Sequence, residues 1–146
     1  MKVIFGCDPN ASDLKKRLIN VAQNMGHTVA DYGSDDPIYA NVAIKVASAV
    51  ASGEGDRGVL ICGTGLGMSI AANKVKGAYA ALLSDVYSAQ RSVLSNNANI
   101  ACMGEFTLGP KLAEELLKTF LSLEFDSSTP SAEKVAKYHE YDELRG

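Results

Sequence analysis

An apolar strand that runs into a glycine-rich turn and then a helix constrains the fold of this chain more than any other feature. Residues 58–62 (GVLIC) are mostly apolar, which is typical of a strand covered on both faces of a sheet. Glycine occupies positions 63, 65 and 67, and the small and apolar residues after Gly67 indicate a helix. A fully buried strand followed by a helix favours a parallel sheet with helices on both faces.

The same alternation of strands and helices continues along the rest of the chain. Further strands are expected at residues 2–7, 27–31, 78–83 and 99–103. Helices are expected at 14–25, 40–51, 87–94 and 110–123, the first of them capped by Asn10 or Ser12, and a polar helix follows at 132–144. Right-handed crossovers then give five parallel strands between two layers of helices, which is a three-layer α/β/α fold.

Composition and charge narrow the range of functions. A length of 146 residues with 47% hydrophobic and 21% charged content fits one soluble domain over residues 1–146. The net charge of -3 and the absence of a dense Lys/Arg run argue against nucleic acid and membrane surfaces, and favour small ligands.

The compartment is expected to be the cytoplasm. No apolar run approaches the about 20 residues that a membrane span needs, and the start MKVIFGCDPN lacks the apolar region of a signal peptide. The odd set Cys7, Cys62 and Cys102 does not form a disulfide framework, which favours a reducing compartment.

The glycine turn is suited to holding an anion beside a thiol. Its glycines let the backbone approach a ligand, and the helix that follows presents free N–H groups. Cys62 ends the strand, at the edge where open α/β sheets bind ligands, and amides there favour a thiolate. The spacing fits neither a Walker A loop nor a dinucleotide-binding turn. Two plainer interpretations stay open: a tight connection without a ligand, and a cysteine that is only a small apolar residue.

Polar residues after other elements strengthen the prediction of a site. Asp8, Asp85 and the pair Ser95-Asn96 are each expected near the carboxyl edge of the sheet, where they converge on one crevice. Taken singly, each has a local explanation: a helix cap for Asp8, a turn or cap for Asp85, and a helix C-terminal turn for Asn96. Their joint position, rather than any one residue, indicates a ligand site.

Several motifs identify a family. The runs ICGTGLGMSIAANKVKG (61–77), GCD (6–8), SDVYSAQRS (84–92), NNAN (96–99) and GPKLAEELLKTFL (109–121) resemble the type B ribose-5-phosphate isomerases and the galactose-6-phosphate isomerase subunits. The resemblance extends from Lys2 to about Val135. It implies a Rossmann-like fold and a homodimer with active sites shared between subunits, in some members paired into a tetramer. The loop and helix at 126–146 are expected at a subunit interface. No metal or organic cofactor is implied.

The resemblance also implies a reaction and roles for residues. The family interconverts an aldose and a ketose phosphate through an enediolate, which needs a base and groups that hold negative charge on oxygen. By position, Cys62 is the base; a second branch of the family uses a glutamate where this chain has Met68. The enediolate would be held by Thr64 and the amides of Gly63, Gly65, Leu66 and Gly67, and the substrate hydroxyls by Asp8 and Asn96, beside Ser95.

This chain departs from the family pattern at the other half of the site. Pro9 and Ser95 replace histidines, of which the second is the family's ring-opening residue. Phe106 replaces a phosphate-binding arginine, and residues 128–130 replace a Gly-Arg-His motif. Lys134 remains near a family arginine position. Ring opening and phosphate recognition are therefore the altered functions.

These departures suit a four-carbon substrate. A tetrose 4-phosphate cannot close a furanose ring, because O4 carries the phosphate, so it needs no ring opening. Its phosphate would then meet Lys134, Arg91 or backbone amides. The Ser-Asn-Asn motif at 95–97 and Tyr-Ala-Asn at 39–41 are similar to isomerases of erythrulose 4-phosphate. We therefore expect conversion of erythrulose 4-phosphate to erythrose 4-phosphate. The alternatives are ribose 5-phosphate isomerisation and, as a different class, a non-catalytic sugar-phosphate-binding partner subunit.

Overall fold

A parallel sheet of five strands organises the computed structural model, which describes residues 1–33 and 35–145. Residues 34 and 146 of the predicted domain lie outside the described residues. The strands lie in the order β2-β1-β3-β5-β4, and every neighbouring pair is parallel. Their bounds are β1 Lys2–Cys7, β2 Thr28–Asp31, β3 Arg57–Cys62, β4 Ala80–Leu82 and β5 Ile100–Gly104. The predicted fold class is confirmed.

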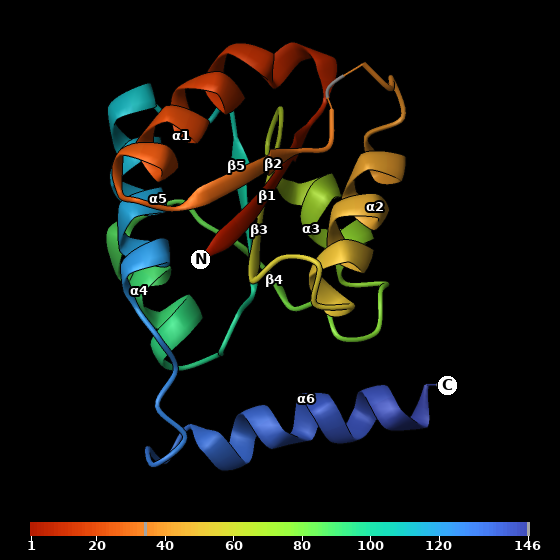
Figure 1. Cartoon of the computed structure of the whole chain (residues 1–146). Coiled ribbons are helices and arrows are strands. Elements are labelled where there is room, and N and C mark those ends of the chain that lie inside the picture. Colours follow the sequence, from red (N-terminus) through yellow and green to blue (C-terminus); the bar gives the residue numbers. More distant parts are fainter. Residues whose placement is uncertain (34, 146) are drawn as a thin grey trace.

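Helices cover both faces of this sheet (Figure 1). One layer contains α1 (Ser12–Asn24), α4 (Val86–Leu94) and α5 (Pro110–Ser122), and the other contains α2 (Tyr39–Ala51) and α3 (Leu66–Ala72). Each expected strand and helix is present, with boundaries that differ from the predicted ones by a few residues.

Two hydrophobic cores lie on the two sides of the sheet. Neighbouring side chains of a strand point to opposite faces, so Phe5 and Ile61 enter the core under α1, α4 and α5, while Ile4 and Leu60 enter the core under α2 and α3. All four of these side chains are fully buried. The unbroken apolar run of β3 follows from this, because both of its faces are covered.

The strand order places a crevice between the carboxyl ends of β1 and β3. The chain leaves β1 toward β2 on one side, whereas it leaves β3 toward β4 and β5 on the other. Such a switch point is where ligands bind in open α/β sheets. The pairing of Cys7 with Ile61, and of Cys62 with Gly104, brings the ends of β1, β3 and β5 to this one edge.

The beginning of α1 differs from the prediction. A 3-10 turn at Pro9–Ala11 precedes the helix, and the Asp8 carboxylate caps it by accepting a 2.8 Å hydrogen bond from the Asn10 amide. The expectation that Asn10 or Ser12 provides the cap is therefore wrong, whereas the local explanation of Asp8 as a cap is confirmed. Proline at the first position of the turn explains the shift, because its fixed φ starts the turn one step after Asp8.

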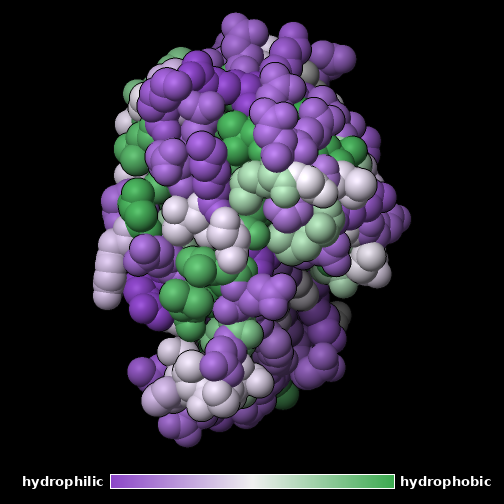
Figure 2. Space-filling view, turned by 60° about the vertical axis from the view of Figure 1, so that its left-hand side comes forward, coloured by the Kyte–Doolittle hydropathy of each residue, from purple (hydrophilic) through white to green (hydrophobic). Residues whose placement is uncertain are grey.

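The helix α6 (Ala132–Leu144) lies apart from the two layers, below the sheet in Figure 1. Val135 is its buried apolar residue, and its surface in Figure 2 is mostly polar to neutral. Polar contacts hold it to the segment before β4: Tyr79 Oη and the Gly77 amide, the latter at 3.0 Å, both donate to the Asp142 carboxylate. Within the described residues, no helix combines the length and apolar character that a membrane crossing requires.

The contacts of Asp142 and Tyr79 set the pH range of this docking. The hydrogen bond from Tyr79 lowers the pKa of Asp142 below its ordinary 3.8. The Asp142 carboxylate therefore stabilises the docked helix fully above pH 3.8, and this stabilisation is lost as the pH falls through the lowered pKa. Burial, followed by the Asp142 hydrogen bond, raises the pKa of Tyr79 above its ordinary 10.0. The phenol therefore contributes fully below pH 10 and loses its contribution as the pH rises through the raised pKa.

We expect Asp142→Ala to release α6 at pH 7, because Tyr79 and Gly77 then lose their shared acceptor. Hydrogen exchange of the α6 amides should accelerate, and the wild-type protein should show the same acceleration only in strong acid or strong alkali. Glu140→Ala is the matched control, since among residues 1–33 and 35–145 the Glu140 carboxylate pairs only with Lys137 of the same helix, at 2.9 Å. Equal protection of α6 in the two variants at pH 7 would contradict the prediction.

Candidate active site

The turn after β3 directs a backbone amide at the thiol of Cys62. The Gly65 amide donates to Cys62 Sγ at 3.1 Å, and the Leu66 amide donates to Thr64 Oγ1 at 3.2 Å. Only 5% of Cys62 is exposed. Gly65 has a φ of +80°, and a Cβ there would lie 2.7 Å from Leu82 Cδ1. The turn therefore requires glycine at position 65 for its conformation and for the space available.

Aromatic rings approach this turn from two sides. A Cβ on Gly63 would lie 2.9 Å from Phe106 Cδ2, and a Cβ on Gly67 would lie 2.4 Å from the ring of Tyr39. The Phe106 side chain is 75% exposed, so the ring covers Gly63 while its outer face is open to solvent. These glycines, predicted to let a ligand approach the backbone, also make room for the two rings.

Main-chain hydrogen bonds join the loops at the carboxyl edge. The Asp8 amide donates to the Ile61 carbonyl at 3.0 Å, which places Asp8 beside the end of β3. The Glu105 amide donates to the Cys62 carbonyl, and the Phe106 amide to the Gly63 carbonyl, each at 2.9 Å. The predicted neighbours Asp8, Cys62 and Thr64 therefore lie at one edge of the sheet.

The three cysteines differ in their surroundings, although all are free thiols. Burial raises the pKa of Cys7 to about 11, and burial also raises the pKa of Cys102. These two thiols stay protonated at neutral pH, as expected of small apolar residues. Cys62 is the one whose sulfur accepts a hydrogen bond from the glycine turn. A donor in that position binds a thiolate more strongly than a neutral thiol.

Asp85 is a helix cap. It follows β4, and its carboxylate accepts 2.7 Å hydrogen bonds from the amide and the hydroxyl of Ser88 in the first turn of α4. These hydrogen bonds lower the pKa of Asp85, as a cap requires. The local explanation accounts for its position.

Ser95 and Asn96 do not converge with Cys62 in this chain, which corrects the expectation of a single crevice. They follow α4 and precede β5, so they lie near the amino end of that strand, whereas Cys62 pairs with Gly104 at its carboxyl end. The four residue steps of β5 separate the two ends by about 13 Å. A helix that connects parallel strands returns the chain to the starting edge, so residues after α4 fall at the opposite edge.

The predicted site residues therefore form two groups. The carboxyl-edge group contains Asp8, Cys62, Gly63, Thr64, Gly65, Leu66 and Gly67. The amino-edge group contains Ser95 and Asn96 after α4, with Lys134 on α6. The two members of this group after α4 have well-defined partners: Ser95 Oγ accepts from Arg91 Nε at 2.7 Å, and Asn96 Nδ2 donates to Tyr138 Oη at 3.1 Å. Lys134 is exposed.

Sequence reasoning missed the contact of Tyr138 and the positions of the two rings. Nothing local links Tyr138, on the polar helix predicted at 132–144, to Asn96, which is 42 residues away in sequence. Arg91 on α4 and Ser95 just after it are four residues apart, and this spacing was a signal that could have been used.

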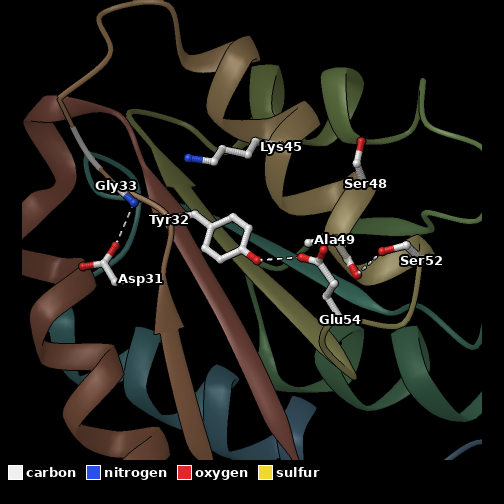
Figure 3. A pocket seen from close by; sticks show the side chains of 8 residues that line it. All are labelled: Asp31, Tyr32, Gly33, Lys45, Ser48, Ala49, Ser52 and Glu54. Atoms are coloured by element: carbon white, nitrogen blue, oxygen red, sulfur yellow. Dashed lines mark hydrogen bonds between the residues drawn. The ribbon is translucent and has the colours of Figure 1, made fainter.

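A hollow of about 850 Å³ lies away from both groups, between β2 and α2 (Figure 3). The Lys45 ammonium lies 5.3 Å from the centre of the Tyr32 ring, and the Tyr32 hydroxyl donates to the Glu54 carboxylate at 2.8 Å. None of the predicted site residues lines this hollow. A second hollow, of about 500 Å³, lies between β4, α4 and α6 and is lined by Arg91, Asn96 and Tyr138.

Fold and site together define a parallel α/β protein whose candidate chemistry centres on a thiol at the switch point of the sheet. Residues 3–138 match the family described as Ribose/Galactose Isomerase. D-erythrulose-4-phosphate isomerase 2 of Mycolicibacterium smegmatis is 49% identical over 92% of this chain and 93% of its own length. D-erythrulose-4-phosphate isomerase of Pectobacterium atrosepticum is 43% identical over 98% of this chain and 97% of its own length.

A solved structure agrees with this match. Ribose-5-phosphate isomerase B of Clostridium thermocellum is 40% identical, with a TM-score of 0.93 over 100% of both chains. The chain belongs to the Ribose/Galactose Isomerase family, a family of sugar-phosphate isomerases. The family predicted from the sequence is confirmed.

We expect Gly65→Ala to disrupt the turn that holds Cys62. A non-glycine residue at this φ costs about 1–3 kcal/mol in backbone strain, and the new methyl group would also collide with Leu82 and the Met103 backbone. Gly26→Ala is the matched control, because its φ is +92° and no atom lies within 4 Å of the added Cβ. Urea denaturation should show the larger loss of unfolding free energy for Gly65→Ala. Equal losses would show that the contacts around Gly65 do not matter.

Proposed function

We propose that this protein is an aldose–ketose isomerase of a tetrulose 4-phosphate, acting from erythrulose 4-phosphate to erythrose 4-phosphate. The observation that carries the proposal is the Gly65 amide at 3.1 Å from Cys62 Sγ, at the switch point of an isomerase-family sheet. The whole chain serves as one isomerase domain, located in the cytoplasm. Its neighbours in sequence include two erythrulose-4-phosphate isomerases.

The geometry suits proton transfer through an enediolate. The Cys62 thiolate takes a proton from C1 of the ketose and the thiol formed returns it to C2, while the hydroxyl proton passes from O1 to O2, which gives the aldose. Negative charge develops on oxygen between these steps. Thr64 and the amides of residues 63 and 65–67 are the donors proposed to stabilise it. Met68 is fully buried in the core under α2 and α3, which leaves Cys62 as the proposed base.

The departures from the family pattern support the four-carbon substrate. Ser95 cannot act as an acid or base near neutral pH, because its hydroxyl has no pKa in that range, so an imidazole's role in ring opening is not available from this residue. A substrate phosphorylated on O4 has no furanose ring to open. The alternative substrate, ribose 5-phosphate, has support from the likeness to ribose-5-phosphate isomerase B.

The separation of the two groups supports a shared site in a homodimer. In a dimer with two-fold symmetry, any contact that the first subunit makes with the second is repeated by the second with the first. One such rotation can therefore join each carboxyl-edge group to the partner's amino-edge group. Exposed apolar side chains are available on both sides of such a contact: Leu66 and Ile70 on α3, and Tyr141 and Leu144 on α6. We propose this dimer as the functional unit, with a tetramer as its further assembly.

Turnover of two sugar phosphates tests the substrate. We expect the purified protein to isomerise D-erythrulose 4-phosphate with a higher kcat/KM than ribose 5-phosphate, and Cys62→Ala to lose about 10²–10⁴-fold in kcat, the usual contribution of a general base. Cys102→Ala is the matched control, since this fully buried thiol lies in the core under α2 and α3. Faster turnover of ribose 5-phosphate would overturn the substrate assignment. Turnover of neither compound would favour the non-catalytic partner subunit.

Mixed dimers test the shared site. Cys62→Ala and Asn96→Ala subunits should each be nearly inactive alone. In a dimer of one of each, one site keeps both residues and the other loses both. When the two kinds of subunit are mixed at random, about half of the dimers contain one of each, and each of these has one intact site out of two. Co-refolded subunits should therefore recover about a quarter of wild-type activity. Activity that stays at the sum of the separate variants would show that each site lies within one subunit.

A further inference from the structure

Arg91 is held in place without being neutralised. Its Nε donates to Ser95 Oγ at 2.7 Å, four residues further along the chain and just after α4, which fixes the plane of the guanidinium and leaves the Nη atoms for another partner. Within residues 1–33 and 35–145, no carboxylate lies within the 4.0 Å salt-bridge distance of Arg91. Arginine held in this way presents a rigid fork of donors, which matches a phosphate group.

The hollow of about 500 Å³ beside Arg91 suits an anion better than the other hollows do. Its lining includes the polar side chains of Ser88, Arg91, Asn96 and Tyr138, and no Asp or Glu of the described residues. The hollow between β2 and α2 is lined by Asp31 and Glu54, and two smaller hollows are lined by Asp13 with Glu105 and by Asp142 with Glu143. Since Tyr138 Oη accepts from Asn96, its own O–H remains to donate, so donors from α4, the turn after it and α6 meet in this hollow.

The position of the phosphate on the substrate depends on the number of carbons in the sugar. In a tetrose 4-phosphate the phosphoryl group is attached to O4, whereas in ribofuranose 5-phosphate O4 is the ring oxygen and the phosphate lies one carbon further away. Ser95 stands where the resemblance implies a ring-opening histidine, whose target is this ring oxygen. With the reacting carbons at the same thiol, the phosphate of a tetrose 4-phosphate therefore reaches one carbon less far than that of ribose 5-phosphate.

We propose that Arg91, positioned by Ser95, binds the phosphate of the substrate in this hollow and thereby selects a four-carbon sugar phosphate. This rests on the proposed function, because the substrate's other end must reach the partner subunit's glycine turn. Arg91 thus takes over phosphate binding from the arginine position that Phe106 occupies. Ser95 acts as a positioning residue, and Asn96 and Tyr138 complete the set of donors.

Binding of inorganic phosphate, measured by calorimetry on the intact protein, tests the site independently of turnover. Arg91→Gln should weaken phosphate binding about 10- to 100-fold, the range for a hydrogen bond to a charged group. It should raise KM for D-erythrulose 4-phosphate by a similar factor, with a smaller change in kcat. Ser95→Ala should give a smaller rise in KM, and Arg91→Lys an intermediate loss of phosphate binding. Arg17→Gln is the matched control, an exposed arginine on α1 that pairs with Glu114 at 3.2 Å.

The outcomes separate this inference from the proposed function. Unchanged phosphate affinity and KM in Arg91→Gln, with erythrulose 4-phosphate still turned over, overturn the role of Arg91 and leave the isomerase standing. Lost phosphate binding in Arg91→Gln, with no turnover by the wild-type protein, supports the anion site and overturns the proposed reaction. If Arg91→Gln does not fold, Arg91→Lys and Ser95→Ala decide the matter, and two unchanged phosphate affinities reject the proposal.

Discussion

The parallel pairing of β3 between β1 and β5 is the constraint on which the rest of this molecule depends. It buries both faces of the strand, so every residue from Arg57 to Cys62 is buried and the sheet has two cores. It also makes the junction of β1 and β3 the point where the chain turns in opposite directions. Cys62 ends that strand at this junction, and the tight glycine turn that follows directs the Gly65 amide at its sulfur. Burial, topology and thiol geometry therefore share one cause.

The same topology divides the candidate site between two edges of the sheet. Each connecting helix brings the chain back to the amino edge, so Ser95 and Asn96 lie beside α6 rather than beside Cys62. The polar contacts of α6 with Tyr79 and Gly77 then place Tyr138 against Asn96. In the proposed homodimer, the edge that performs proton transfer and the edge that recognises the phosphate come from different subunits. Changes at Ser95 and Arg91 can then alter substrate choice without disturbing the thiol.

Sequence patterns predicted the elements well where their causes are local. The apolar run of 58–62 and the glycines after it specify a strand and a turn within ten residues, and Pro110 marks the start of α5 as expected. The prediction that Asn10 or Ser12 caps the first helix was wrong, because a turn that begins at Pro9 makes Asp8 the cap. Several neighbouring residues can act as caps, and residue preferences alone do not decide between them. The prediction that Ser95 and Asn96 converge with Cys62 was wrong, because it assigned residues after a helix to the carboxyl edge of the sheet. Residues after α4 lie instead near the amino end of β5.

By itself the sequence determined the order of strands and helices, the family and the identity of the candidate base, because these depend on periodicity and on short motifs. Only the tertiary structure decided which residues lie together. The Asn96 amide meets Tyr138 across 42 residues, Phe106 covers Gly63, and the hollow beside Arg91 combines β4, α4 and α6. Such contacts arise from how layers pack and where each crossover returns the chain. These are properties of the folded molecule as a whole, which no local stretch of residues encodes.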